Sequence, residues 1–269
     1  HGLITNHIIS AELAKELIKK FLKKEESELN HLLDLIDDNG QTIEYTGGDA
    51  AYQTLSNFYI ISFLSIFPDH KSNKNLIKFL KSSFFFISNF CFPNGSFSDE
   101  LGSRGSNIVY PAGMIFFNSK IKKWFIDKYL KNNFVNPQTV EDSNFTVLFN
   151  CWSFSYNNLQ NLNFNFLNPK PNKKIVQTSD YLFINTKNDK TIVNINRGYI
   201  KMVKNLNGRF NSFICSGFFN KNYITQGCKV NLNRITVNKF EIRLNKRKYF
   251  EKNNNYFYAI IIRILSIIL

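Results

Sequence analysis

The stretch NNLQNLNFNFLNPKPNKK, residues 157–174, divides the chain into two parts with different hydrophobic periods. It is dominated by Asn, Leu and Phe, and it carries Pro169 and Pro171, which disfavour helices and central strands. Before it, apolar residues recur at the helical spacing of about 3.6 residues. After it, they alternate with polar residues, as in strands. We therefore interpret 157–174 as a linker between a helical and a strand-rich part.

The part before the linker predicts a series of helices. Their expected ranges are 8–24, 28–36, 50–67, 75–92, 115–132 and 139–156. The turn residues at 37–40 should end the second helix, and Asp49 can cap the third. Helical hairpins in series are typical of a helical toroid or solenoid.

The part after the linker predicts short strands at 181–185, 191–196, 199–204, 213–219, 223–225, 229–237 and 240–244. Helices followed by antiparallel strands indicate an α+β protein. We expect an N-terminal helical domain at 1–156 and a C-terminal antiparallel domain at 175–269. Because the chain begins with His1 and ends inside an apolar run, we expect both termini, and the second domain, to be truncated.

Composition limits the class of function. The 269 residues are 43% hydrophobic and 16% aromatic, which is typical of a globular protein, and the net charge of +14 favours an anionic partner. An acidic polysaccharide and a nucleic acid both fit that charge, and so does a charge that serves solubility alone. No nucleic-acid motif accompanies it, so we expect no nucleic acid. The four cysteines lack CxxC spacing, and we expect neither a metal nor a cofactor.

The apolar run at 258–269 is too short to span a bilayer and contains Arg263, so it predicts a buried strand and no transmembrane segment. The sequence assigns neither an oligomeric state nor a compartment, and leaves cytoplasm and periplasm both open.

Three polar motifs interrupt the helical part. In TNH, Thr5 or Asn6 could cap the first helix, or Asn6 and His7 could hydrogen-bond a substrate carboxylate. In EYTGGDAAYQ, residues 44–53, a glycine turn leads into a helix that carries Asp49, Tyr52 and Gln53 near its start. Tyr52 could equally be a packing residue.

The third motif is PNGSFSDELGSRGSNIVYPAG, residues 93–113. Its glycines and small residues indicate a tightly bent backbone without helical or strand periodicity. Asp99, Glu100 and Arg104 could form an ion-pair cluster, or Arg104 could hold a sugar carboxylate with two hydrogen bonds. We expect 93–113 and 43–59 to form the two walls of a carbohydrate cleft.

These three motifs together resemble the heparinase II/III-like family, over roughly the first 115 residues. The resemblance implies an (α/α) toroid followed by a β-sandwich, and a polysaccharide lyase that cleaves an acidic, uronate-containing glycan. It places the neutralisation of the uronate carboxylate on Asn6 or His7 and the proton transfer on Tyr52. The candidate substrate-binding residues are Glu44, Asp49, Gln53, Glu100, Arg104 and Tyr110.

β-Elimination explains these residue types, because the C5 proton of a uronate becomes removable only when hydrogen bonds neutralise the carboxylate beside it. A tyrosine can then serve as base and acid. The sequence departs from the family pattern at Gln53, where lyases often carry histidine, and it has no histidine after His70. Tyr181 or Tyr199 could substitute in the second domain. A non-catalytic glycan-binding or assembly protein and a uronate C5-epimerase therefore remain alternatives.

Overall fold

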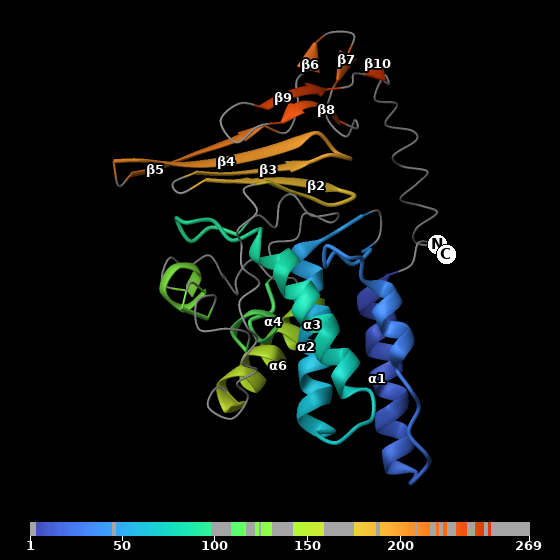
Figure 1. Ribbon diagram of the computed structural model, residues 1–269. Coiled ribbons are helices and arrows are strands. Elements are labelled where there is room, and N and C mark those ends of the chain that lie inside the picture. Colours follow the sequence, from blue (N-terminus) through green and yellow to red (C-terminus); the bar gives the residue numbers. More distant parts are fainter. Residues whose placement is uncertain are drawn as a thin grey trace, which may run out of the picture.

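The computed structural model describes residues 4–44, 47–97, 109–116, 122–123, 125–130, 142–158, 175–186, 189–207 and 209–215, together with the backbone of five later strands. The described helices are α1 (Thr5–Phe21), α2 (Ala50–Ile66), α3 (Asn73–Ser88), α4 (Ala112–Ile115) and α6 (Asp142–Asn158). A five-stranded antiparallel sheet follows in the order β1-β2-β3-β4-β5. The chain is therefore an α+β protein, and Figure 1 shows the helices lying against one face of this sheet.

The long helices confirm the periodic pattern. Asp49 caps α2 as predicted, because its Oδ1 accepts hydrogen bonds from the backbone N–H of Ala51 at 3.1 Å and of Tyr52 at 3.0 Å. The predicted cap of α1 is wrong. Thr5 and Asn6 lie inside the first turn, and the N-cap position is Ile4, which makes no side-chain cap.

The segment predicted as a helix at 28–36 is a 3₁₀ helix, Asn30–Leu35. Its start is attached to the neighbouring helix, since the Leu29 N–H donates to Ser72 Oγ at 2.8 Å. The expected helix at 115–132 appears in the described residues as the short α4 and a π-helical turn, Phe125–Leu130.

The strands are β1 (Ile175–Gln177), β2 (Tyr181–Asn185), β3 (Asp189–Asn194), β4 (Tyr199–Leu206) and β5 (Arg209–Cys215). Consecutive strands pair antiparallel, with Phe183 opposite Ile192 and Ile192 opposite Lys201. β2 matches its predicted range, whereas β1 was not predicted and β5 begins earlier than expected. Smaller pieces, β6 (Phe219–Asn220), β7 (Tyr223–Ile224), β8 (Val230–Ile235), β9 (Phe240–Leu244) and β10 (Arg247–Lys248), lie beyond the other face of the sheet in Figure 1.

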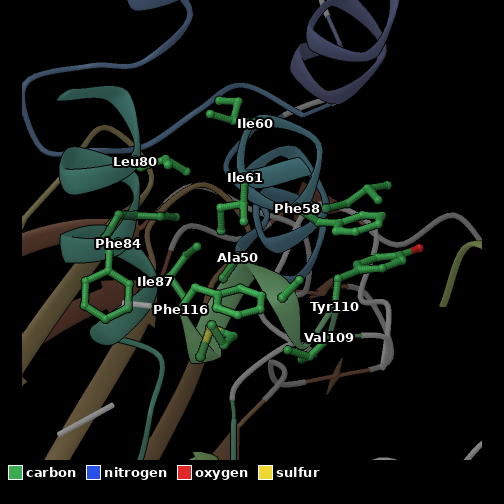
Figure 2. Close-up of a cluster of buried hydrophobic side chains, with 14 of the residues drawn as sticks. Ala50, Phe58, Ile60, Ile61, Leu80, Phe84, Ile87, Val109, Tyr110 and Phe116 are labelled. Atoms are coloured by element: carbon green, nitrogen blue, oxygen red, sulfur yellow. The ribbon is translucent and has the colours of Figure 1, made fainter. Parts of the chain in front are cut away.

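The helices and the sheet share one hydrophobic core, which is rich in Phe. Figure 2 shows its helical part, in which α2 and α3 face Tyr110 and Phe116. At the sheet, the Phe90 ring on the helical side meets those of Tyr181 and Phe183 at 5.0 and 5.1 Å between centroids. These aromatic contacts hold β2 against the C-terminal end of α3.

A buried lysine makes a polar connection in the same place. Lys190 of β3 donates from Nζ to the backbone carbonyls of Ser88 at 3.3 Å and Cys91 at 2.9 Å, just beyond the end of α3. A cation at a helix C-terminus satisfies free carbonyls and complements the helix dipole. Burial lowers the pKa of Lys190 to about 8. The sheet is therefore fixed over the C-terminal end of α3.

Candidate functional site

The start of α1 is joined to the loop that precedes α2. Thr5 donates to the carbonyl of Ile43 from its backbone N at 3.2 Å and from its hydroxyl at 2.8 Å. The backbone N of Asn6 donates to Glu44 Oε1 at 3.2 Å. Two motifs that are 38 residues apart in the sequence are thereby brought into contact.

The loop between Glu44 and Asp49 turns sharply onto α2. Glu44 and Gly47 exchange two backbone hydrogen bonds, at 2.9 and 3.1 Å, and Asp49 then caps the helix. The N-termini of α1 and α2 consequently meet around one short loop. Helix N-termini favour negative charge, because their first N–H groups point outward and the helix dipoles add. Here, however, those groups already have partners: the Thr5 and Asn6 N–H groups donate to Ile43 and Glu44, and the first N–H groups of α2 donate to Asp49. Two acidic side chains of the chain itself therefore lie where an anion would bind.

Asn6, Glu44 and Ser56 form a buried polar cluster, the Asn6–Glu44–Ser56 cluster. Their exposed fractions are 1%, 0% and 0%. Within the described part of the chain, both side-chain amide atoms of Asn6, Oε2 of Glu44 and Oγ of Ser56 make no hydrogen bond. Native proteins leave few buried polar atoms in this condition, and each such group calls for an explanation.

The carboxyl group of Glu44 favours its neutral form. Burial, together with the charge of Asp49, raises the pKa of Glu44 to about 8, although the backbone N–H of Asn6 and the nearby Ser56 hydroxyl oppose the shift. A carboxyl group in this environment holds its proton at neutral pH.

The remaining candidates of the first two motifs occupy different environments. His7 is exposed, whereas its neighbour Asn6 is buried. Tyr52 is half-buried against the core and interacts electrostatically with the buried Tyr110. Burial first, and then Tyr52 and Tyr59, raise the pKa of Tyr110. The backbone N of Tyr110 donates to Thr54 Oγ1 at 2.9 Å. Tyr110, a candidate from the third motif, therefore lies against α2, the helix that carries Tyr52.

Gln53 has a structural role in this geometry. Its Oε1 accepts from the backbone N and the hydroxyl of Thr42 at 3.2 and 3.1 Å. Its Nε2 donates to the Gly40 carbonyl at 2.6 Å and to Ser83 Oγ at 2.8 Å. All four hydrogen-bonding positions of the amide are filled from within the chain, and the residue is fully buried. These hydrogen bonds fix the loop before α2, and a contact between Gln53 and a substrate stays a prediction.

A small hollow lies where the glycine turn meets the sheet. Its volume is about 10 Å³, room for roughly one water molecule, and it is lined by Gly47, Gly48, Asp180, Tyr181, Asn194, Asn196 and Arg197. Asp180 Oδ2 accepts from the Gly48 N–H at 2.6 Å and from Gln41 Nε2 at 2.5 Å, and Oδ1 accepts from Asn196. The Tyr181 hydroxyl donates to the Gly48 carbonyl at 2.6 Å.

The sequence did not predict Asp180, Asn196 and Arg197 as residues of this hollow, because strand periodicity identifies buried apolar positions and not polar residues in turns. It named Tyr181 only as one of two alternatives to a histidine in the second domain, with Tyr199. Tyr181 lines the hollow, but burial raises its pKa, and its hydroxyl already donates a hydrogen bond to the Gly48 carbonyl. This places it as a residue that fixes the turn.

Glu100 and Arg104 lie outside the described residues, as does most of the wall predicted at 93–113. His70 lies away from this site and packs against Glu16 of α1. In the described parts, no cluster of His, Cys, Asp or Glu has the composition of a metal site. No described helix is both long and apolar enough to cross a membrane.

Comparisons with known proteins identify no relative: no protein-family model, no curated protein and no solved structure matches this chain.

Proposed function

We propose that this protein acts on an acidic, uronate-containing polysaccharide as a lyase of the heparinase II/III-like type. The observation that carries the proposal is the meeting of the α1 and α2 starts, which is fixed by the hydrogen bond from Asn6 N to Glu44 Oε1. It brings the Asn6–His7 motif to the helix that carries Tyr52.

The proposed architecture is an (α/α) toroid-like helical domain followed by a β-sandwich. Support for a second sheet layer comes from β2 and β3, whose side chains are buried on both faces. Tyr181 and Phe183 face the helices, whereas Leu182, Ile184 and Val193 form a separate buried cluster. A sheet that is apolar on both faces needs cover on both.

In the proposed reaction, Asn6 or His7 hydrogen-bonds the uronate carboxylate and so stabilises the carbanion-like transition state formed at C5. Tyr52 removes the C5 proton and returns a proton to the glycosidic oxygen that leaves from C4. Glu44 and Asp49 hold the loop and the helix start in place. Arg104 and Glu100 are proposed to contact the substrate from the third motif.

The test is the ultraviolet absorbance of the unsaturated uronate product, measured over a panel of acidic polysaccharides. We expect product from the wild-type protein and a loss of about 10²–10⁴-fold in Tyr52→Phe. Tyr59→Phe on the same helix is the matched control and should retain activity. Equal loss in both variants would point to general damage of α2 and would contradict the role of Tyr52.

Two alternatives have separate signatures in the same panel. A C5-epimerase would give no absorbance but would incorporate deuterium from heavy water at C5. A glycan-binding or assembly protein would bind the polysaccharide and give neither signal. The Asn6 side chain is buried, so in each of these cases it has to be uncovered before it can contact a glycan.

A further inference from the structure

The donor and acceptor inventory of the Asn6–Glu44–Ser56 cluster is unbalanced when Glu44 is ionised. The Asn6 Oδ1 and Glu44 Oε2 atoms are then two buried acceptors, and neither has a partner among the described residues. Apart from the Asn6 NH₂ group, the Ser56 hydroxyl is the single side-chain donor of the cluster that can serve them. A proton on Glu44 Oε2 supplies the second donor and balances the cluster.

We propose that Glu44 is a proton-bearing positioning residue that keeps the side-chain NH₂ of Asn6 available for the ligand. In the protonated state, Oε1 accepts from the backbone N of Asn6, as the structure shows, and Oε2–H acts as a donor within the cluster. When Glu44 ionises, its Oε2 becomes a strong acceptor, and the side chain of its hydrogen-bonded neighbour Asn6 carries a buried amide donor, Nδ2, that lacks a partner. Ionisation thus withdraws the Asn6 NH₂ from the ligand.

The charged surroundings of Glu44 agree with a neutral carboxyl group. Asp49 at the start of α2 repels a charge on Glu44. His7 lies next to Asn6 on α1, exposed to solvent, and Asp180 and Tyr181 lie across the Gly47–Gly48 turn. Burial and Asp49 together bring the pKa of Glu44 to about 8. A modest rise in pH above neutrality is therefore enough to ionise Glu44.

The first measurement needs no ligand. The side-chain ¹⁵N–¹H₂ resonances of Asn6, assigned by their loss in Asn6→Ala, are followed by NMR from about pH 6 to about pH 10. We expect them to titrate with a midpoint near pH 8 in the wild type and to stay constant in Glu44→Gln, whose amide is a permanent neutral donor. Glu12→Gln on α1 is the matched control and should titrate like the wild type.

Two results overturn the inference in this measurement. One is an Asn6 side chain that does not titrate in the wild type. The other is a titration that persists in Glu44→Gln, which would assign it to another group. Asp49→Asn retains a helix-capping residue and removes the neighbouring charge, so the midpoint should move to lower pH in this variant.

The second measurement rests on the proposed function. In a Tyr52→Phe background, binding of oligogalacturonate, oligoalginate and hyaluronan oligosaccharides is measured by calorimetry over the same pH range. Affinity should fall roughly tenfold per pH unit above the midpoint, and Glu44→Gln should abolish this fall. If none of these oligosaccharides binds while Asn6 still titrates, the proposed function fails and the coupling stands. If one binds without this pH dependence, the coupling to the ligand fails and the proposed function stands.

Discussion

At the scale of single residues, Glu44 predicts an unusual dependence of stability on pH. Its pKa is raised from 4.5 to about 8 on folding, so the folded protein binds a proton more tightly than the unfolded chain. The resulting stabilisation is complete below pH 4.5 and is lost as the pH rises towards 8. At 1.36 kcal/mol per pKa unit, the loss amounts to a few kcal/mol, at most roughly 5.

Chemical denaturation at a series of pH values measures this loss. Glu44→Gln should flatten the profile between pH 4.5 and about 8, since its side chain cannot ionise. Glu12→Gln should leave the profile unchanged. A wild-type profile that rises steadily across this window would show that Glu44 is ionised in the folded protein.

How well the sequence predicts a residue's role depends on where its partners lie. The cap at Asp49 was predictable, because its partners are the next residues of α2. The role of Gln53 was not, because two of its partners, Gly40 and Ser83, lie 13 and 30 residues away. The same reason hides the contact between Asn6 and Glu44, which depends on how α1 packs against the loop.

At the scale of elements, the long helices follow from their periodic apolar faces, whereas the short ones depend on tertiary contacts. Asn30–Leu35 is held through Leu29 and Ser72, and this tertiary attachment overrides the helical pattern at 28–36. The strand β1 has only three residues, too few for its apolar–polar alternation to be recognised, yet it pairs along its whole length with β2. Such pairing cannot be predicted from the residues of β1 alone.

The approach of α4 to α2 depends on a glycine. A Cβ atom at Gly113 would lie 2.1 Å from the backbone oxygen of Thr54, so any larger residue has to push the two helices apart. Gly113→Ala should therefore cost about 2–3 kcal/mol of unfolding free energy. The control is Gly198→Ala. Gly198 lies in a turn with a φ of 69°, which is strained for alanine, so we expect this variant to lose about 1 kcal/mol of unfolding free energy. Equal costs would show that α4 tolerates displacement.

At the scale of the whole molecule, the helices and the sheet are joined by the core and by several polar connections, of which Lys190 and Asp180 carry two. The two connections fix different places: Lys190 lies at the end of α3, and Asp180 lies at the glycine turn before α2. Since Asp180 accepts hydrogen bonds from both Gln41 and Asn196, one carboxylate joins the loop of the helical part to a turn of the sheet. The position of the candidate site consequently depends on the contact between the two parts.

Asp180→Ala should loosen this contact without disrupting either part. It leaves three donors without their acceptor at a site that is 8% exposed, and each lost partner costs about 1 kcal/mol or more, so we expect a loss of roughly 3 kcal/mol. The amide of Gly48 should exchange faster with heavy water, while the amides in the middle of α3 and β3 should change less. Asp189→Ala, on a half-buried position of the same sheet, is the matched control and should alter stability by less than about 1 kcal/mol. If Gly48 exchanges no faster in Asp180→Ala than in Asp189→Ala, the Asp180 carboxylate does not hold the glycine turn against the sheet. The remaining contacts, among them the hydrogen bond from the Tyr181 hydroxyl to the Gly48 carbonyl, are then sufficient to hold it.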